Sequence, residues 1–229
     1  MTSVKLLKTC LFFILFSFSV DAMKFVHPTD VVKKVKENFA NLDSYEAEFT
    51  IVSERKDQKK YTTGTAYYKK GGKINFTFTN PPNDVIISNG KKMWVFISRL
   101  NAVAVQDIKA GTSGKSLTES FTESGVITLF NRYHYAYANV NQPMVINKDS
   151  FYVLSLKEKV ASGGFSEMKV YISSETYFIT KIEAEAPVSR KVTLTLRNVQ
   201  QNIDLPNNLF QFNISDTMKV VENALTTAQ

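Results

Sequence analysis

Few residues of this chain are of a type that could catalyse a reaction or hold a metal ion. Its 229 residues include two histidines, His27 and His134, and one cysteine, Cys10. Zinc sites usually take three or four His, Cys or carboxylate ligands, so this set argues against a site of the His/Cys type. The chain has no Gly-x-Ser-x-Gly sequence, which marks the nucleophile of many hydrolases. We therefore predict no cofactor, no metal and no enzymatic activity.

Three other candidate groups have simpler explanations. Gly114-Lys115-Ser116 resembles the end of a phosphate-binding loop, but Lys109 stands where that motif needs its first glycine. His134 lies within an aromatic cluster, which favours a packing or hydrogen-bonding role over a catalytic one. A set of acidic residues fits a solvated helix end and strand face, rather than a pair of catalytic carboxylates: Asp43, Glu46 and Glu48.

The first residues have the features of a signal peptide. Lys5 and Lys8 precede an apolar run at 11–20, and Val20 and Ala22 fit the small-residue positions of a cleavage site. A retained N-terminal anchor is the alternative interpretation. The part after the cleavage site has no cysteine and forms no disulfide, which suits a bacterial periplasm. We predict two segments: a signal peptide, residues 1–22, and a single domain, residues 23–229.

The formal net charge of +7 does not indicate a nucleic-acid partner. The basic residues are scattered as doublets, such as Lys33-Lys34 and Lys91-Lys92, beside acidic neighbours. Doublets of this kind are usually solvated residues of turns and edges, and an exported protein rarely meets nucleic acid. Weak attraction to anionic lipid headgroups is a better explanation of the excess charge.

Residues 64–106 read as a series of antiparallel strands separated by turns. Asn89-Gly90 is the clearest turn, because a tight hairpin needs residues that tolerate a positive φ. In a sheet with one solvent-exposed face, apolar and polar residues alternate along each strand. The segments 85–87 and 93–96 are instead apolar on both faces. We therefore expect both faces of this part of the sheet to be covered.

Two amphipathic helices could provide part of that cover. In the first, Thr29 is the predicted N-cap, and Val31, Val35 and Phe39 recur at helical spacing. The second is predicted at 126–130, after a polar loop. In all, the pattern predicts about ten or eleven strands. Two arrangements fit it: an ordinary core beneath the helices, or a curved sheet with a hydrophobic cavity and the helices as a movable lid.

The order of these motifs resembles a known family. An entry strand at 45–49 and a terminal Pro-x-x-Leu-Phe-x-Phe element at 206–212 also match that family. The central matching residues are Gly64, Lys70-Gly71, Ile74-Asn75-Phe76, Pro81, Val85-Ile86-Ile87, Ser88-Asn89-Gly90 and Met93-Trp94-Val95-Phe96. The set resembles the periplasmic outer-membrane lipoprotein carrier family, LolA.

The resemblance implies a mainly β (α+β) fold: an unclosed antiparallel β-barrel, or half-barrel, with a lid of short helices over a hydrophobic cavity. It implies a periplasmic chaperone that shields the acyl chains of lipoproteins and carries them from the inner to the outer membrane. The implied partners are acylated lipoproteins, an inner-membrane ABC transporter complex and an outer-membrane lipoprotein receptor. We expect a monomer.

The resemblance also implies roles for particular residues. The family arginine that holds the lid by bonding to lid carbonyls corresponds to Lys70, and lysine lacks the planar fork of arginine. Lys70 is therefore expected to form a looser latch, or to be a solvated turn residue. Acyl-chain cavity residues, each of which could equally be plain core, are Ile74, Phe76, Phe78, Ile86, Trp94, Leu129 and Phe130.

Other functions stay open at this point. A periplasmic lipid-sensing regulator could use the same half-barrel, although such regulators usually add a C-terminal domain, and only a short tail follows Phe212. A carrier of free lipids or glycolipids is another possibility, but such relatives are often lipid-anchored and no signal-peptide cysteine stands at an anchoring position. An enzyme acting on lipid comes last, since no nucleophile is evident.

Overall fold

The computed structural model describes residues 25–56, 58–108, 119–160, 165–186 and 190–222. In this part the chain forms two α-helices, three short 3-10 helices and thirteen strands. The helices are α1 (Pro28–Ala40), α2 (Glu123–Arg132), η1 (Ser98–Leu100), η2 (Glu119–Phe121) and η3 (Asn207–Phe210). The strands are β1 (Ser44–Arg55), β2 (Gln58–Lys69), β3 (Lys73–Asn80), β4 (Val85–Asn89), β5 (Lys92–Ile97), β6 (Ala102–Asp107), β7 (Tyr133–Tyr137), β8 (Met144–Ile146), β9 (Asp149–Glu158), β10 (Glu167–Ser173), β11 (Ile179–Ala186), β12 (Arg190–Gln201) and β13 (Lys219–Glu222).

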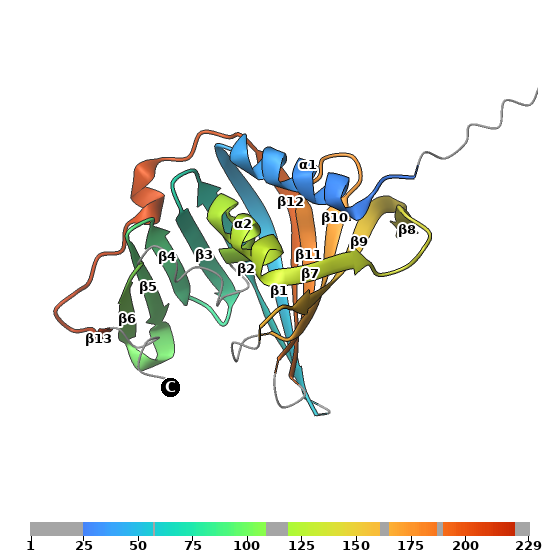
Figure 1. The fold of residues 1–229 in the computed structure, drawn as a ribbon. Helices are drawn as coiled ribbons and strands as arrows, with labels where there is room; N and C mark the ends of the chain where they lie inside the picture. The colour runs from blue at the N-terminus through green and yellow to red at the C-terminus, as the bar shows by residue number, and fades with distance from the viewer. Residues whose placement is uncertain (1–24, 57, 109–118, 161–164, 187–189, 223–229) are drawn as a thin grey trace, which may run out of the picture.

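All strands belong to one curved sheet that does not close (Figure 1). Its order is β13-β6-β5-β4-β3-β2-β1-β12-β11-β10-β9-β7, with β8 pairing β9 beyond the end of β7. Every pair is antiparallel except β13 with β6. The predicted half-barrel with helices over its concave face is thus confirmed. The strand count exceeds ten or eleven because the short β7, β8 and β13 were not predicted.

The N-cap of helix α1 lies two residues earlier than the sequence suggested. It is His27, not Thr29: the backbone N–H of Thr29 donates to His27 Nδ1 at 3.3 Å. The physical reason is Pro28, which has no N–H to satisfy and whose fixed φ suits the first helical position. Thr29 instead supports the cap, since its hydroxyl lies 2.9 Å from His27 Nδ1.

The apolar stripe of α1 fills the concave face over β1 and β10–β12. Val31, Val32, Val35 and Phe39 are buried along it. The Phe39 ring stacks on Phe178 with centroids 5.1 Å apart, as part of an apolar cluster that continues into the strands. This half of the molecule therefore has an ordinary packed core. Burial of each large apolar side chain contributes about 1.5–3 kcal/mol to the stability of the fold.

Helix α2 covers the concave face further along the sheet (Figure 1). The Thr122 hydroxyl accepts from the Gly125 N–H at 3.0 Å and caps the helix. The other end is bonded to Lys159, the residue that follows β9. The Lys159 backbone N–H donates to the Arg132 carbonyl, and the Lys159 Nζ donates to the Asn131 carbonyl. Helix α2 is thus fixed most firmly at its C-terminal end.

The convex face of β3–β6 is covered by the chain that leads into β13. The Asn75 side chain, which is buried, donates to the Leu209 carbonyl at 2.6 Å. Further along, the Phe96 and Phe212 rings lie 5.6 Å apart. This crossing segment explains why the strands here are apolar on both faces. None of the described helices has the length and apolar composition needed to cross a membrane.

Candidate functional site

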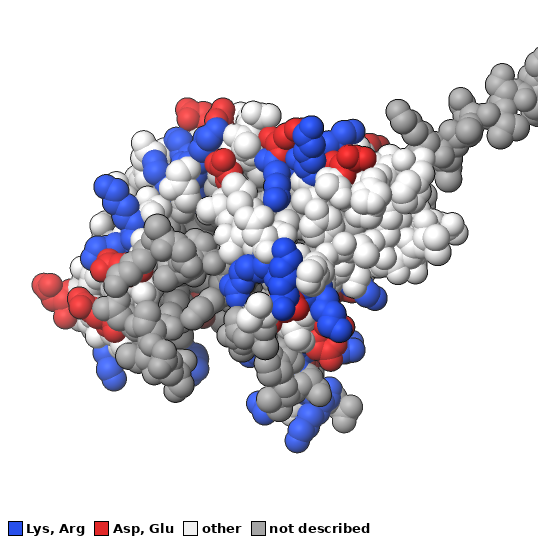
Figure 2. Space-filling model, viewed as in Figure 1, with Lys and Arg blue, Asp and Glu red and all other residues white. Residues whose placement is uncertain are grey.

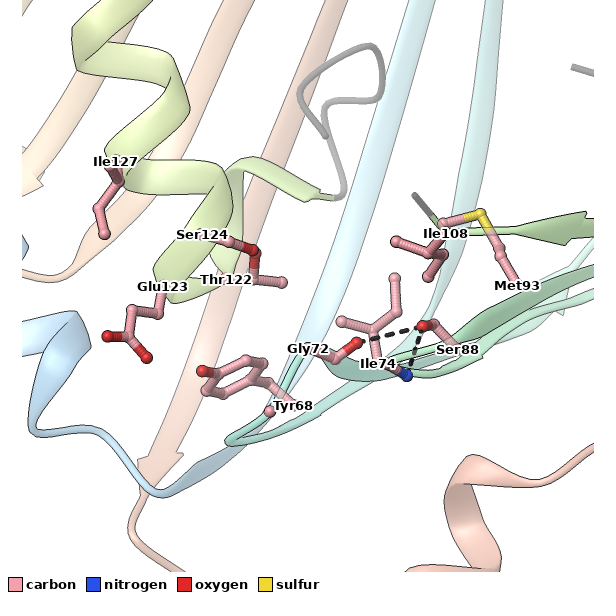
Figure 3. A pocket seen from close by; sticks show the side chains of 12 residues that line it. Tyr68, Gly72, Ile74, Ser88, Met93, Ile108, Thr122, Glu123, Ser124 and Ile127 are labelled. Atoms are coloured by element: carbon pink, nitrogen blue, oxygen red, sulfur yellow. Dashed lines mark hydrogen bonds between the residues drawn. The ribbon is translucent and has the colours of Figure 1, made fainter. Parts of the chain in front are cut away.

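A cavity of about 360 Å³ lies between the N-terminal half of α2 and the strands β2–β5 (Figure 3). Its position is on the concave side, beyond the half that α1 fills. Its lining residues are Tyr68, Gly71, Gly72, Ile74, Ser88, Gly90, Met93, Ile108, Thr122, Glu123, Ser124 and Ile127. The volume falls at the lower end of the roughly 300–1,000 Å³ typical of small-molecule sites.

The strand wall of the cavity is set by the register of three neighbouring strands. Ile74 pairs with Ser88, and Ser88 pairs with Met93, so the three side chains point to the same face. The Ser88 hydroxyl forms two hydrogen bonds with the neighbouring turns. It donates to the Gly72 carbonyl at 3.1 Å and accepts from the Gly90 N–H at 3.0 Å (Figure 3). The wall therefore presents apolar atoms and one satisfied hydroxyl.

Two turns meet at the rim of this wall without side chains between them. A Cβ added to Gly90 would lie 2.2 Å from the carbonyl oxygen of Gly71, and Gly90 has a φ of +88°. Only glycine combines that backbone conformation with such a close approach. The rim is thus backbone, and it leaves the space beside Ile74 open.

The opposite side of the cavity is the start of α2. Ile127, which is 42% exposed, lines the cavity together with Glu123 and Ser124 of the same helix (Figure 3). Between the two sides lies Tyr68, whose pKa is raised to about 12, chiefly by burial. Its phenol therefore stays protonated at any physiological pH, and the described wall carries no charge apart from Glu123.

Tyr68 stacks on Tyr45 with ring centroids 5.4 Å apart, at the boundary between the cavity and the packed core. Burial also raises the pKa of Tyr45 well above its ordinary value. Within the described part of the chain, the Tyr45 hydroxyl has no hydrogen-bond partner. The backbone of Glu123, at the start of α2, lies close enough to the Tyr68 hydroxyl to oppose the rise in its pKa. The pair therefore provides a large apolar surface, and Tyr68 turns its polar atom toward the start of α2.

Apart from Trp94, the cavity residues proposed from the sequence fall into three groups. Ile74 lines the cavity, and Phe76, Phe78 and Ile86 lie on the same concave face by register. Phe76 is fully buried against Phe49, with centroids 5.1 Å apart, so it forms the floor between cavity and core. On α2, Leu129 and Phe130 are buried, as are Gly125 and Val126, and both pack into the core below the helix.

Trp94 requires a correction. It pairs with Ile87 and not with Ile86, and this register places it on the convex face. Met93 and Val95 occupy the concave positions of the same strand, because successive side chains of a strand point to opposite faces. The turn at Asn89-Gly90 fixes which residues of β4 and β5 lie opposite each other, so the face of Trp94 could be predicted from the sequence.

Lys70 contacts a helix of the lid. Its Nζ donates to the Ala40 carbonyl, the last residue of α1, at 2.7 Å. Its backbone N–H donates to Asp43 at 2.8 Å. No basic residue of α1 itself lies in the last helical turn, so Lys70 supplies the positive charge that this helix end favours.

Sequence reasoning missed most of the polar and α2 residues of the cavity. Met93, Ile108 and Ile127 are apolar lining residues that it did not select. Tyr68 follows a strand pattern and could have been assigned to the concave face from its pairing position. In the described residues, no group of three or more His, Cys, Asp or Glu side chains could hold a metal ion.

The geometry defines a class of protein: an open half-barrel with a helical lid and an apolar cavity beneath it. Comparison with known proteins then identifies the family. The family model described as "Outer membrane lipoprotein carrier protein LolA" matches residues 40–213. The chain belongs to the LolA family.

Individual relatives are distant. An outer-membrane lipoprotein carrier protein of Legionella pneumophila (strain Lens) is 24% identical over 172 residues, which are 75% of this chain and 79% of that protein. The uncharacterized protein MJ0687 of Methanocaldococcus jannaschii is 24% identical over 227 residues, 98% of this chain but only 63% of that protein. An uncharacterized conserved protein from Thermus thermophilus shares the fold, with a TM-score of 0.56, 10% identity, and coverage of 85% of this chain and 98% of that one.

Family membership supports a lipid- or lipoprotein-binding protein that works outside the cytoplasm. Members of this family are binding or chaperone proteins rather than enzymes. The apolar lining of the cavity fits such a role.

Proposed function

We propose that this protein is a periplasmic chaperone that shields the acyl chains of lipoproteins and carries them from the inner to the outer membrane. The observation that carries the proposal is the cavity between α2 and the strand wall, apolar at Ile74, Met93 and Ile127. In this proposal the cargo comes from an inner-membrane ABC transporter complex and passes to an outer-membrane lipoprotein receptor. The protein acts as a monomer.

The energetics of the cargo fit this kind of site. Each buried methylene is worth about 0.8 kcal/mol, so exposing one chain of about fifteen methylenes to water costs about 12 kcal/mol. A cavity of about 360 Å³ is small for several such chains. Loading therefore requires the space below α2 to widen, and Lys70 is proposed as the latch that holds the neighbouring α1 end.

The experiment adds the purified protein to spheroplasts and analyses the soluble complexes. We expect acylated lipoproteins to be released in complex with the wild-type protein. Ile127→Glu places a charge at the cavity on a half-exposed residue and should abolish release. Val140→Glu, at a residue that is 92% exposed and does not line the cavity, should leave release unchanged.

Two results would overturn the proposal. Recovery of free phospholipid alone would favour a free-lipid carrier on the same fold. Recovery of nothing apolar would favour a lipid-sensing regulator that never removes cargo from the membrane. For the latch, loading and release by Lys70→Ala that match the wild type would show that Lys70 has no such role.

A further inference from the structure

The open sheet ends in β13 on one side and in β7 on the other (Figure 1). Strand β13 pairs in parallel with β6, and its four residues are all exposed. In the described part of the chain, β7 pairs with β9 and with no second strand. An edge strand presents unpaired backbone groups that can accept another strand.

The hydrogen bonds at both ends of β7 show which of its backbone groups point outward. The Ala138 N–H donates to the Val153 carbonyl at 2.9 Å, and the Arg132 carbonyl accepts from Lys159 at 3.0 Å. Along an antiparallel pair of strands, residues whose backbone groups bond to the partner strand alternate with residues whose backbone groups point away from it. In this segment the backbone groups of the even-numbered residues therefore point toward β9. The N–H and C=O groups of the odd-numbered residues, Tyr133, Tyr135 and Tyr137, point away from the sheet.

Most of these outward groups are unpaired. The Tyr133 N–H donates to the Leu129 carbonyl at the end of α2. For the backbone groups of Tyr135 and Tyr137, the described residues supply no hydrogen-bond partner. The strand reads Tyr-His-Tyr-Ala-Tyr and lacks the lysine, proline or bulge with which proteins usually protect an edge.

Three basic residues lie near the start of β7. Lys36 donates to the Asn131 side chain at 3.4 Å and Lys159 to the Asn131 carbonyl at 2.8 Å, which brings both cations to the junction of α2 and β7. Arg132 lies there too, 3.4 Å from Glu158, whose side chain is only 7% exposed. Lys and Arg atoms gather at the middle of this face of the molecule (Figure 2).

We propose that the free edge of β7 binds an extended segment of a partner polypeptide as an added strand, and that this segment is acidic where it passes the α2–β7 junction. The outward groups of Tyr135 and Tyr137 offer two donors and two acceptors, which give affinity without selecting side chains. The basic residues at the α2–β7 junction favour acidic side chains in the bound segment. They also determine which end of the segment lies at the junction. This site is separate from the acyl-chain cavity and does not depend on it.

The test is a titration of the isotope-labelled protein without residues 1–22, which keeps every described helix and strand, followed by NMR. The probes are two peptides, Glu-Glu-Thr-Val-Thr-Val-Thr and Thr-Val-Thr-Val-Thr-Glu-Glu, which allow for either strand direction. We expect one of them to shift and protect the amides of Tyr135 and Tyr137. Replacing Glu-Glu by Lys-Lys should weaken binding at least about fivefold, because the cations would then repel it.

Two variants separate the backbone from the side chain. Tyr135→Pro removes the outward N–H but no bond to β9, and proline is tolerated at such edge positions. Tyr135→Val removes the same ring contact with Phe130 and keeps the N–H. We expect the proline variant to lose binding and the valine variant to retain it, with both melting at similar temperatures.

Several results would overturn the proposal. These are no binding of either acidic peptide at about 1 mM, shifts located elsewhere than β7, or equal binding by the two Tyr135 variants. Light scattering adds one more: a dimer that Tyr135→Pro dissociates would show that the edge receives a second copy of this chain instead.

Discussion

The bond from Lys70 to the end of α1 makes a prediction that can be worked through in detail. Lys70→Met keeps the apolar stem and the backbone N–H bond to Asp43, and removes only the charged donor to Ala40. An ordinary intramolecular hydrogen bond contributes about 0.5–1.5 kcal/mol net. A cation at an exposed helix C-terminus contributes about 0.3–1 kcal/mol.

These two figures describe the same contact, so they are not summed, and we expect a loss of about 1 kcal/mol for Lys70→Met. This corresponds to about a fivefold increase in the opening equilibrium of the last turn of α1. Hydrogen exchange should therefore be about fivefold faster at residues 37–40 and unchanged in the first turn of the helix. High salt should bring the wild type toward the variant, because the charge contribution is screened.

Lys33→Met is the matched control. Lys33 lies on the exposed side of the same helix and makes only a 3.9 Å contact with Glu37. We expect it to leave exchange in the last turn nearly unchanged, since exposed ion pairs contribute little. Exchange in Lys70→Met that equals the wild type at low salt would refute the reasoning about the latch.

Three further predictions concern packing, each measured by denaturant unfolding. Gly64→Ala places a Cβ 2.1 Å from the Thr77 carbonyl oxygen and 2.7 Å from the Phe49 ring, and should destabilise by about 1–3 kcal/mol or more; full stability would show that the backbone yields. Phe178→Ala should cost about 3–5 kcal/mol, because its ring packs on both Phe39 and Tyr45; a loss below about 1 kcal/mol would contradict this. Tyr45→Phe should be neutral or stabilise by about 1 kcal/mol, because the buried hydroxyl has no described partner. Burial raises the pKa of Tyr45 in the folded state, so wild-type stability should fall as pH rises above about 10, where unfolded tyrosine ionises, and the variant should lose less.

Much of the meander could be predicted because its turns and strands are set locally. Asn89 shows why: its side chain accepts from the N–H groups of Lys91 and Lys92, so the turn is determined by adjacent residues. The alternation of side chains then follows, and counted through the turn it places Met93 on the concave face and Trp94 on the convex face. Strand β7 had a similar local signal, since tyrosines alternate with His134 and Ala136.

The covering of the convex face could not be predicted in the same way. It depends on contacts such as Asn75 with Leu209, which are 134 residues apart in the sequence. The Leu-Phe pattern near the C-terminus marks a structured segment, but nothing local indicates which face it crosses. The same limit applies to β13, whose four residues are all exposed and whose pairing with β6 is set by the path of the preceding chain.

A packed core and a hydrophobic cavity, which the sequence left as alternatives, occur in different halves of the sheet. Over β1 and β10–β12, large aromatic side chains such as Phe39 and Phe178 are buried in a packed core on the concave face. Near the turns of β2–β3 and β4–β5 the concave side chains are Ile74, Ser88 and Met93, and the rim is formed by glycine backbone. Because α2 is tied to Lys159 at its C-terminal end, any widening of the space must come from its N-terminal end, where Ile127 and Glu123 stand over the wall. Under the proposed function, acyl chains would thus enter beside the turns of β2–β3 and β4–β5, and the aromatic half would serve as the rigid support against which α2 moves.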